Sequence, residues 1–397
     1  MQVAPSARIS LLATLILTAS CVIVVPPPKA PPKVAEEVKE EPAKPRLIVE
    51  PDLWDTVEAV NSGCDAHLAK AEGLKAEIKA VEGARTLENT LEPLNMLLTE
   101  LDRALPVAQL LANVHPAKEV REAAEKCEQK GKKYLSELKR DRAMFDALNG
   151  VKAAGLDPLA TRFQALLLRE YRRAGVDKDE ATRKKLADLS EQMVALGQQF
   201  GKAIREDSKT MEVAEKDLKG MPADWIASHK KEGKVKITVS TDYPDFIPIQ
   251  SYAAKEGVRL KMYKLFLTRA FPGNTEVLTK LLKARHEYAT LLGFKDWASY
   301  NAEDKMVKER KVISDFIEKV TALARPRMKA DLAQILKRKK KDHRAAKVVG
   351  SWDRFYYVNK IQQEQFGVDP TEVREYFDFV KVKEGLLTIT QELFGLT

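Results

Sequence analysis

The sequence predicts a mainly α-helical protein with one small β excursion near residues 234–240. Charged residues make up 31% of the 397 residues and hydrophobic residues 44%, with only 18 glycines, which is typical of a folded, helix-rich protein. From about residue 50 onward, apolar side chains recur at steps of three and four, the spacing that places them on one face of a helix. The net charge of +9 is compatible with acidic substrates or anionic surfaces, and we expect no nucleic-acid partner.

Residues 1–20 have the pattern of a signal peptide. Arg8 supplies a short positive region, and the apolar stretch ISLLATLILTA follows at 9–19. Small residues then precede Cys21, as in the lipobox of bacterial lipoproteins, so we expect cleavage before Cys21 and lipidation of that residue. An uncleaved transmembrane anchor over 9–25 and a bare secretory signal remain as alternatives.

Residues 21–46 are expected to form a tether that begins at the lipidated cysteine. The segment 26–46, PPPKAPPKVAEEVKEEPAKPR, is rich in Pro, Lys and Glu and favours extended polyproline conformations. A lipid followed by such a spacer would hold a soluble domain at a membrane. We therefore expect a bacterial envelope location, lipid-anchored and periplasm-facing. Cys64 and Cys127 could pair in an oxidising compartment, which the sequence leaves open.

Helical patterns then follow one another. Segments 86–105, 117–148 and 158–173 show the three-and-four spacing, with glycines at 150, 155 and 175 between them. The clearest pattern lies in ATRKKLADLSEQMVALGQQFGKAI, where one face carries Leu186, Leu189, Met193, Leu196, Phe200 and Ile204.

One strand interrupts the helices. Val235, Ile237 and Val239 alternate with polar residues, as in a strand with one apolar face. Pro222, before it, suits the first turn of a helix. The two prolines of DYPDFIPIQ, after it, exclude a central strand, and helices resume from about residue 251.

The segment KARHEYATLL at 283–292 begins like a zinc-peptidase signature. In H-E-x-x-H, two histidines four residues apart place both imidazoles on one helix face, beside a glutamate that acts as general base. Here Thr290 stands where the second histidine belongs, so His286 and Glu287 form no such site. The sequence instead predicts a core helix with a surface histidine, whose apolar residues are Leu278, Leu281, Leu282, Ala289, Leu291 and Leu292.

No other segment supplies a complete active site. The remaining histidines are scattered, and Cys64 with His67 makes only half of a zinc-binding pattern. Phosphate-binding and nucleophile-elbow motifs are absent from the sequence. The basic run KRKKK at 337–341 could touch phosphates, but it is more typical of a helix end where the lysines stay solvated. We therefore assign no catalytic and no metal-binding residue.

Several segments in order resemble the thimet oligopeptidase, neurolysin and oligopeptidase A family of zinc metallopeptidases. They are RTLENTLEPLNMLLTELDRA, LSEQMVALGQQFGKAIRED, MPADWIASH, KVKITVSTDYPDFIPIQSYA, VLTKLLKARHEYATLLGFKDWASY, SWDRFYYVNK and EYFDFVKVKEGLLTITQELFGL. Gly201 stands where that family more usually has Asn. The resemblance covers roughly residues 50–397.

This resemblance implies a multi-helix, zincin-type oligopeptidase architecture. An N-terminal helical domain is expected at 47–220 and the start of the metallopeptidase domain at 221–397, with the catalytic part missing and the zinc motif beyond the LFGL stretch. The resemblance also implies zinc as cofactor, without ligands in this chain, and short peptides as substrates. Whether these residues act as an enzyme stays open, the alternative being a non-catalytic helical binding or scaffold lipoprotein. In the last helix, near 384–394, four apolar side chains are expected to be exposed: Leu386, Leu387, Ile389 and Leu393.

Overall fold

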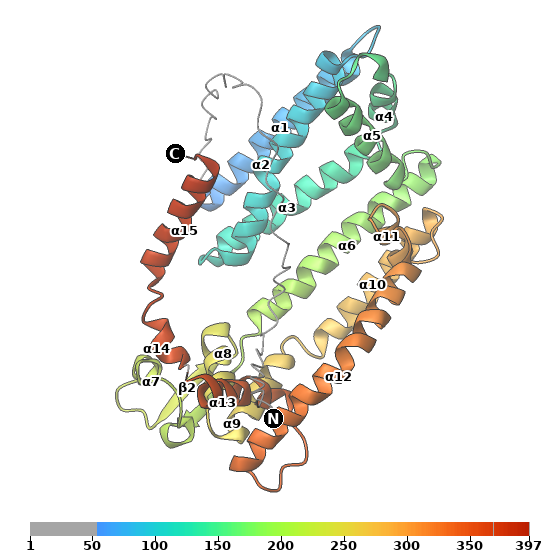
Figure 1. Cartoon of the computed structure of the whole chain (residues 1–397). Helices are drawn as coiled ribbons and strands as arrows, with labels where there is room; N and C mark the ends of the chain where they lie inside the picture. The colour runs from blue at the N-terminus through green and yellow to red at the C-terminus, as the bar shows by residue number, and fades with distance from the viewer. Residues whose placement is uncertain (1–53, 368, 397) are drawn as a thin grey trace, which may run out of the picture. The chain divides into compact units, whose positions relative to one another are not determined.

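Fifteen α-helices and one two-stranded sheet make up the described part of the chain, in agreement with the predicted mainly α-helical class (Figure 1). The structure is a computed structural model and describes residues 54–367 and 369–396. The predicted signal peptide, Cys21 and the tether lie outside the described residues. The helices are α1 Val57–Ala80, α2 Glu92–Val114, α3 Lys118–Leu138, α4 Arg142–Asn149, α5 Pro158–Arg173, α6 Glu180–Glu206, α7 Ala223–His229, α8 Tyr243–Tyr252, α9 Glu256–Leu267, α10 Gly273–Leu291, α11 Trp297–Glu303, α12 Arg310–Asp342, α13 Arg354–Phe366, α14 Pro370–Arg374 and α15 Phe379–Phe394.

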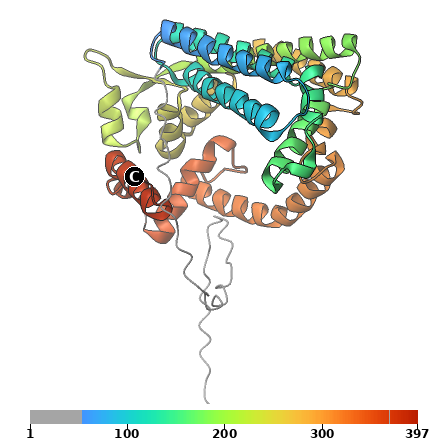
Figure 2. The same cartoon turned by 90° about the horizontal axis from the view of Figure 1, so that it is seen from above.

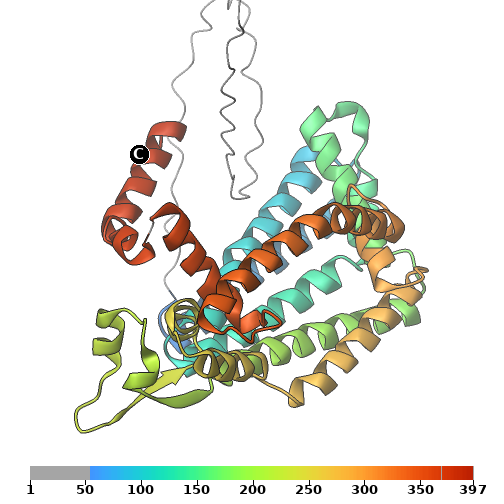
Figure 3. The same cartoon turned by 60° about the horizontal axis from the view of Figure 1, so that its bottom comes forward.

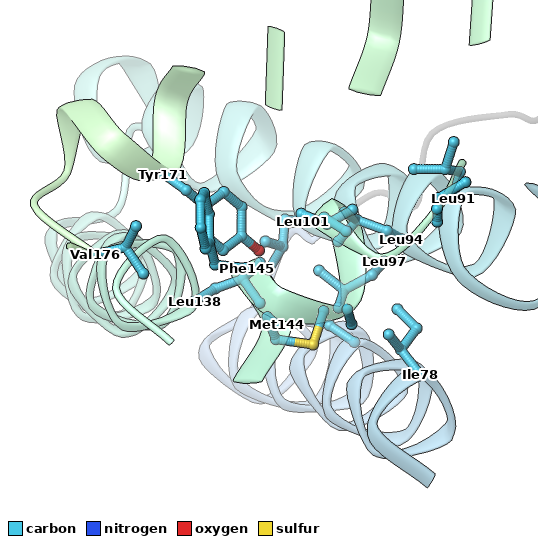
Figure 4. Close-up of a cluster of buried hydrophobic side chains, with 14 residues drawn as sticks. Ile78, Leu91, Leu94, Leu97, Leu101, Leu138, Met144, Phe145, Tyr171 and Val176 are labelled. Carbon is cyan, nitrogen blue, oxygen red and sulfur yellow. The ribbon is translucent and has the colours of Figure 1, made fainter. Parts of the chain in front are cut away.

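Helices α1, α2 and α3 pack on one another, α3 packs on α6, and α6 packs on α10. Ile78, Leu94 and Leu101 point into a core that α4 and α5 close with Met144, Phe145 and Tyr171 (Figure 4). Seen from above, α12 runs along the side opposite α1 (Figure 2). This order leaves α3 and α6 as neighbouring walls in the middle of the helical array.

Short polar residues begin several of these helices. The side chains of Thr56, Asp157 and Asp179 accept hydrogen bonds from backbone N–H groups in the first turns of α1, α5 and α6. Asp141 does the same for α4, accepting from the N–H of Met144 at 3.2 Å. The predicted segment 117–148 is therefore not one helix, because a turn at 139–141 divides it into α3 and α4.

The β excursion has a partner strand that the sequence analysis missed. Strand β2, Lys236–Ser240, pairs antiparallel with β1, Thr210–Ala214. Ile237 and Val239 are buried as predicted, whereas Val235 lies before the strand and is exposed. Strands on either side of residue 220 thus share one core, which α8 and α9 complete. The domain division at 220–221 stays a prediction.

The buried face of α10 is rotated from the predicted one. Leu281 and Ala289 are buried, but Leu278 and Leu282 are 41% and 53% exposed. The face that packs against α6 instead carries Val277, Leu281, Ala284 and Tyr288. A shift of one residue turns a helix face by about 100°. Apolar residues stand in adjacent pairs, Val277–Leu278 and Leu281–Leu282, so the sequence did not distinguish the two faces.

A disulfide joins α1 to α3. The sequence left open whether Cys64 and Cys127 pair, and the structure links them at a sequence separation of 63 residues. Both cysteines are buried.

Among the described residues, none of the helices is both long and apolar enough to cross a lipid bilayer.

Helix α15, at the red end of the ribbon beside the C-terminus in Figure 3, carries exposed apolar side chains, as the sequence predicted. The exposed fractions are 64% for Leu386, 54% for Leu387, 56% for Ile389 and 73% for Leu393.

Candidate functional site

Helices α3 and α6 pack on each other (Figure 1), and cavities lined by residues of both helices form a groove. Three cavities of about 590, 420 and 280 Å3 lie along it. All three include Lys132 of α3 together with Ser190 and Val194 of α6 in their walls, so they adjoin one another. We call the three together the α3/α6 groove. Their volumes fall at or near the range of pockets that bind small ligands in proteins.

Polar side chains bridge the two walls of the groove. Gln198 of α6 exchanges hydrogen bonds with α3, accepting from Gln129 at 2.6 Å and donating to Glu128 at 2.7 Å. Glu125 of α3 accepts from Lys202 and Arg205 of α6, each at 3.1 Å. The walls are therefore held together by hydrogen bonds and ion pairs, which leaves polar groups along the groove.

Two glycines of α6 widen the groove. Gly197 and Gly201 line its second cavity, and a Cβ atom at either position would meet no other atom within 4 Å. Glycine inside a helix costs about 1 kcal/mol relative to alanine. The absence of side chains at these two positions leaves open space along this wall of the groove.

Basic side chains dominate the groove lining. The cations are Lys126, Lys130, Lys132, Lys133, Lys139, Arg140, Arg173, Arg205 and Arg285, and the anions are Glu125, Glu128, Glu170 and Glu191. Much of this charge is compensated internally, as in the Lys133–Glu191 pair at 3.0 Å. The excess of positive charge favours ligands that carry carboxylates.

The histidines do not assemble into a metal site. His286 lies on the exposed side of α10. The Thr290 hydroxyl donates to the His286 carbonyl oxygen at 2.9 Å. His67 is buried with its Nδ1 at 2.7 Å from Glu100, and its neighbour Cys64 is in the disulfide. Within 54–367 and 369–396, no three His, Cys, Asp or Glu side chains gather to hold a metal ion.

Comparison with known proteins finds similarity to one family of peptidases. The model of peptidase family M3 matches residues 249–397. The chain is 27% identical over 346 residues to the thimet-like oligopeptidase of Dictyostelium discoideum, covering 82% of this chain and 51% of that protein. It is 24% identical over 331 residues to oligopeptidase A of Escherichia coli, covering 79% and 48%. These matches support peptidase family M3 for this chain, at about 25% identity. It spans about half the length of the curated relatives it matches.

Family M3 is zinc-dependent in general. The donor set needed for that ion, typically histidines with a carboxylate, does not come together in the described part of this chain. The residues present therefore do not fit the metal, and no chemical step is assigned through it. The described part of this chain does provide the α3/α6 groove.

The segment matched by the M3 model contains a buried ionic cluster. Asp353 accepts from Arg259 of α9 at 2.8 Å and from Lys339 of α12 at 2.6 Å, and Lys339 also donates to Glu256 at 2.9 Å. Arg259 and Asp353 are fully buried, and Lys339 is 5% exposed. The run 337–341 does end a helix, but the prediction that its lysines stay solvated is wrong for Lys339. Its partners lie on other elements of the fold, where the sequence pattern could not locate them.

Electrostatics within this cluster follow from its pairing. Burial alone would raise the pKa of Asp353, but the hydrogen bonds from Lys339 and Arg259 outweigh it and lower that pKa. Burial would lower the pKa of Lys339, and the hydrogen bonds to Asp353 and Glu256 raise it. Arg259 also donates to backbone carbonyls, at 2.7 Å for Ala253 and 3.0 Å for Ala254. The cluster therefore ties α9 and α12 together.

One further cluster superficially resembles a hydrolytic triad. His229 lies 2.7 Å from Asp245 through Nε2 and 3.1 Å from Ser228 through Nδ1. However, Nδ1 also lies 2.7 Å from the carbonyl oxygen of Trp225, to which the Ser228 hydroxyl donates at 2.9 Å. Because Nδ1 faces an acceptor, it donates and cannot take the serine proton. This cluster anchors α7 to α8 and is not a nucleophile site.

Proposed function

We propose that this chain forms the peptide-binding helical half of a zinc-dependent oligopeptidase and that short peptides occupy the α3/α6 groove. The observation that carries the proposal is an open groove, lined by nine basic and four acidic side chains, in a chain that is similar to peptidase family M3. Relatives that match the chain are named oligopeptidases, and saccharolysin of Saccharomyces cerevisiae matches 78% of it at 25% identity. The groove combines polar side chains on α3 and α6 with open space at Gly197 and Gly201, which suits a bound peptide.

Occupancy of the groove can be tested by filling it. Leucine at Gly201 would project into the second cavity, whereas leucine at Gly73, a helical glycine of α1 with equally open surroundings, would face away from the groove. We expect Gly201→Leu to abolish binding of a fluorescent pentapeptide in a polarisation assay, and Gly73→Leu to leave it unchanged. Equal binding by both variants would refute the groove as the peptide site.

The catalytic zinc site, in this proposal, is supplied by sequence outside these 397 residues. The chain contains no H-E-x-x-H sequence, and the relatives are about twice as long as the part that it matches. The decisive experiment reads the coding sequence after residue 397 and assays the full product with a quenched fluorescent peptide. An in-frame H-E-x-x-H and cleavage that stops with a zinc chelator would support the proposal.

A non-catalytic binding or scaffold lipoprotein is the second candidate. A stop codon directly after residue 397, together with peptide binding but no cleavage, would establish this candidate and exclude the enzyme.

We also propose that the protein is lipid-anchored at Cys21 in a bacterial envelope and faces the periplasm. Two features support this location: the signal-like segment that ends at Cys21, and the Cys64–Cys127 disulfide, a bond that persists in oxidising compartments. Labelled palmitate should enter the wild-type protein and be absent from Cys21→Ala. Unlabelled wild-type protein that retains residues 1–20 would instead favour the transmembrane alternative.

A further inference from the structure

The third cavity of the α3/α6 groove is lined by a buried cation that has no ion-pair partner among the described residues. This cavity, of about 280 Å3, forms where α3, α5, α6, α10 and α11 converge, and we call it the Arg140 pocket. Arg140 lies in the turn between α3 and α4 and is 8% exposed. Its guanidinium hydrogen-bonds two hydroxyls, those of Ser136 and Tyr288.

The other cations of the pocket all have carboxylate partners. Lys132 lies 2.5 Å from Glu128, Lys139 lies 3.5 Å from Glu170, and Arg173 pairs with Glu303 and Asp304. Among the described residues, no carboxylate oxygen lies within 4 Å of the Arg140 guanidinium nitrogens, which is the limit for an ion pair. Arg140 is therefore the one cation lining the pocket that has no carboxylate in ion-pair contact among the described residues, and Glu137 and Glu191 act on it only from a longer distance.

Such an arrangement costs free energy unless an anion completes it. Burial lowers the pKa of Arg140, yet a guanidinium remains protonated in proteins. Where this chain buries an arginine for structure, it supplies the partner, as Asp353 does for Arg259 at 2.8 Å. The contrast indicates that the partner of Arg140 comes from outside the described chain.

Neighbouring tyrosines would complete an anion-binding arrangement. Burial raises the pKa of both Tyr288 and Tyr300, so their hydroxyls stay protonated at neutral pH and can donate hydrogen bonds. Glu170 in the same wall disfavours a ligand of high negative charge. Arg140 supplies one cation without an ion-pair partner, and the pocket has a volume of about 280 Å3, so it suits a single carboxylate group.

We propose that the Arg140 pocket binds a carboxylate of the peptide held in the α3/α6 groove, with Arg140 as the counter-charge and Tyr288 as a hydrogen-bond donor. The inference rests on the proposed function, because the pocket adjoins the other two cavities at Lys132, Ser190 and Val194. The carboxylate belongs either to the C-terminus of the peptide or to an acidic side chain near it. A pocket at the end of the groove would thus set where a bound peptide stops.

The test compares three fluorescent pentapeptides of the same sequence by polarisation: the free acid, the C-terminal amide, and an amide whose last residue is Glu. We expect the wild-type chain to bind the free acid at least ten-fold more tightly than the amide. Arg140→Gln should lower the affinity for the free acid to that for the amide and leave the amide unchanged. Arg142→Gln, an exposed arginine two residues away that pairs with Asp146, is the matched control and should bind as wild type.

Further measurements distinguish the source of the carboxylate, a failure of the Arg140 pocket and a failure of the groove. Tight binding of the Glu-ended amide would identify a side-chain carboxylate as the source, and weak binding would identify the terminus. Equal affinities for free acid and amide would overturn the inference while leaving the groove in place. If no peptide binds, N-acetylphenylalanine serves as probe: its Arg140-dependent binding would retain the carboxylate pocket and refute the groove. Should Arg140→Gln fail to fold, Tyr288→Phe, which removes only a hydroxyl, should weaken free-acid binding selectively.

Discussion

Replacing Asp353 by alanine should destabilise the chain more than any exposed charge substitution. Asp353 is fully buried and accepts hydrogen bonds from Arg259, Lys339 and the backbone N–H of Gly350. Its removal leaves two buried cations without their shared partner. Because breaking a buried ion pair from one side costs about 3–5 kcal/mol, we expect Asp353→Ala to lower the free energy of unfolding by about that amount.

The matched control is Asp224→Ala. Asp224 pairs with Arg374 at 2.9 Å, but both side chains are more than half exposed, so its loss should cost less than about 1 kcal/mol. Guanidinium denaturation at pH 7, followed by circular dichroism, measures both variants against wild type. Equal destabilisation of the two variants would refute the reasoning that burial makes the Asp353 pairs costly to break.

The same cluster predicts a direction of pH dependence. The pKa of Asp353 is lowered on folding from its ordinary value of 3.8, so its stabilisation is complete above that value and is lost as the pH falls below it. The pKa of Lys339 is raised from 10.5, so its stabilisation is complete below that value and is lost as the pH rises above it. Asp353→Ala should therefore show a smaller loss of stability between pH 5 and pH 3 than wild type.

Three further predictions concern packing, the disulfide and the apolar face of α15. Leu281→Ala should lower the free energy of unfolding by about 2–5 kcal/mol through a cavity, whereas Leu282→Ala, at an exposed position of the same helix, should cost far less; similar losses in denaturation would contradict the observed face of α10. Cys64→Ser should cost about 4 kcal/mol under oxidising conditions, given a loop of 63 residues, and added reductant should not destabilise that variant further. The exposed apolar face of α15 is expected to make the chain self-associate. Glutamate at both Leu386 and Leu393 should reduce this association in sedimentation velocity without changing the circular dichroism spectrum. Unchanged association would exclude this face as its cause.

Local periodicity was sufficient for much of the secondary structure. The face of α6 that carries Leu186, Leu189 and Leu196 is buried, and strand β2 buries Ile237 and Val239, as their spacing predicts. These features depend on neighbours along the chain, which the sequence displays directly. On α10 the same reasoning chose a face one residue out of place, because apolar residues cover more than one side of that helix.

The sequence by itself determined the helical class, the exposed apolar face of α15 and the failure of the H-E-x-x-H motif at Thr290. Only the tertiary structure decided which buried charges have partners. Arg140 and Lys339 both stand in short basic runs, KRDR and KRKKK, that look alike in sequence. Folding brings Asp353 to Lys339 and leaves Arg140 among hydroxyls, because partners in space come from segments far apart in the chain. The local sequence does not indicate which residues from other segments will lie beside these side chains after folding.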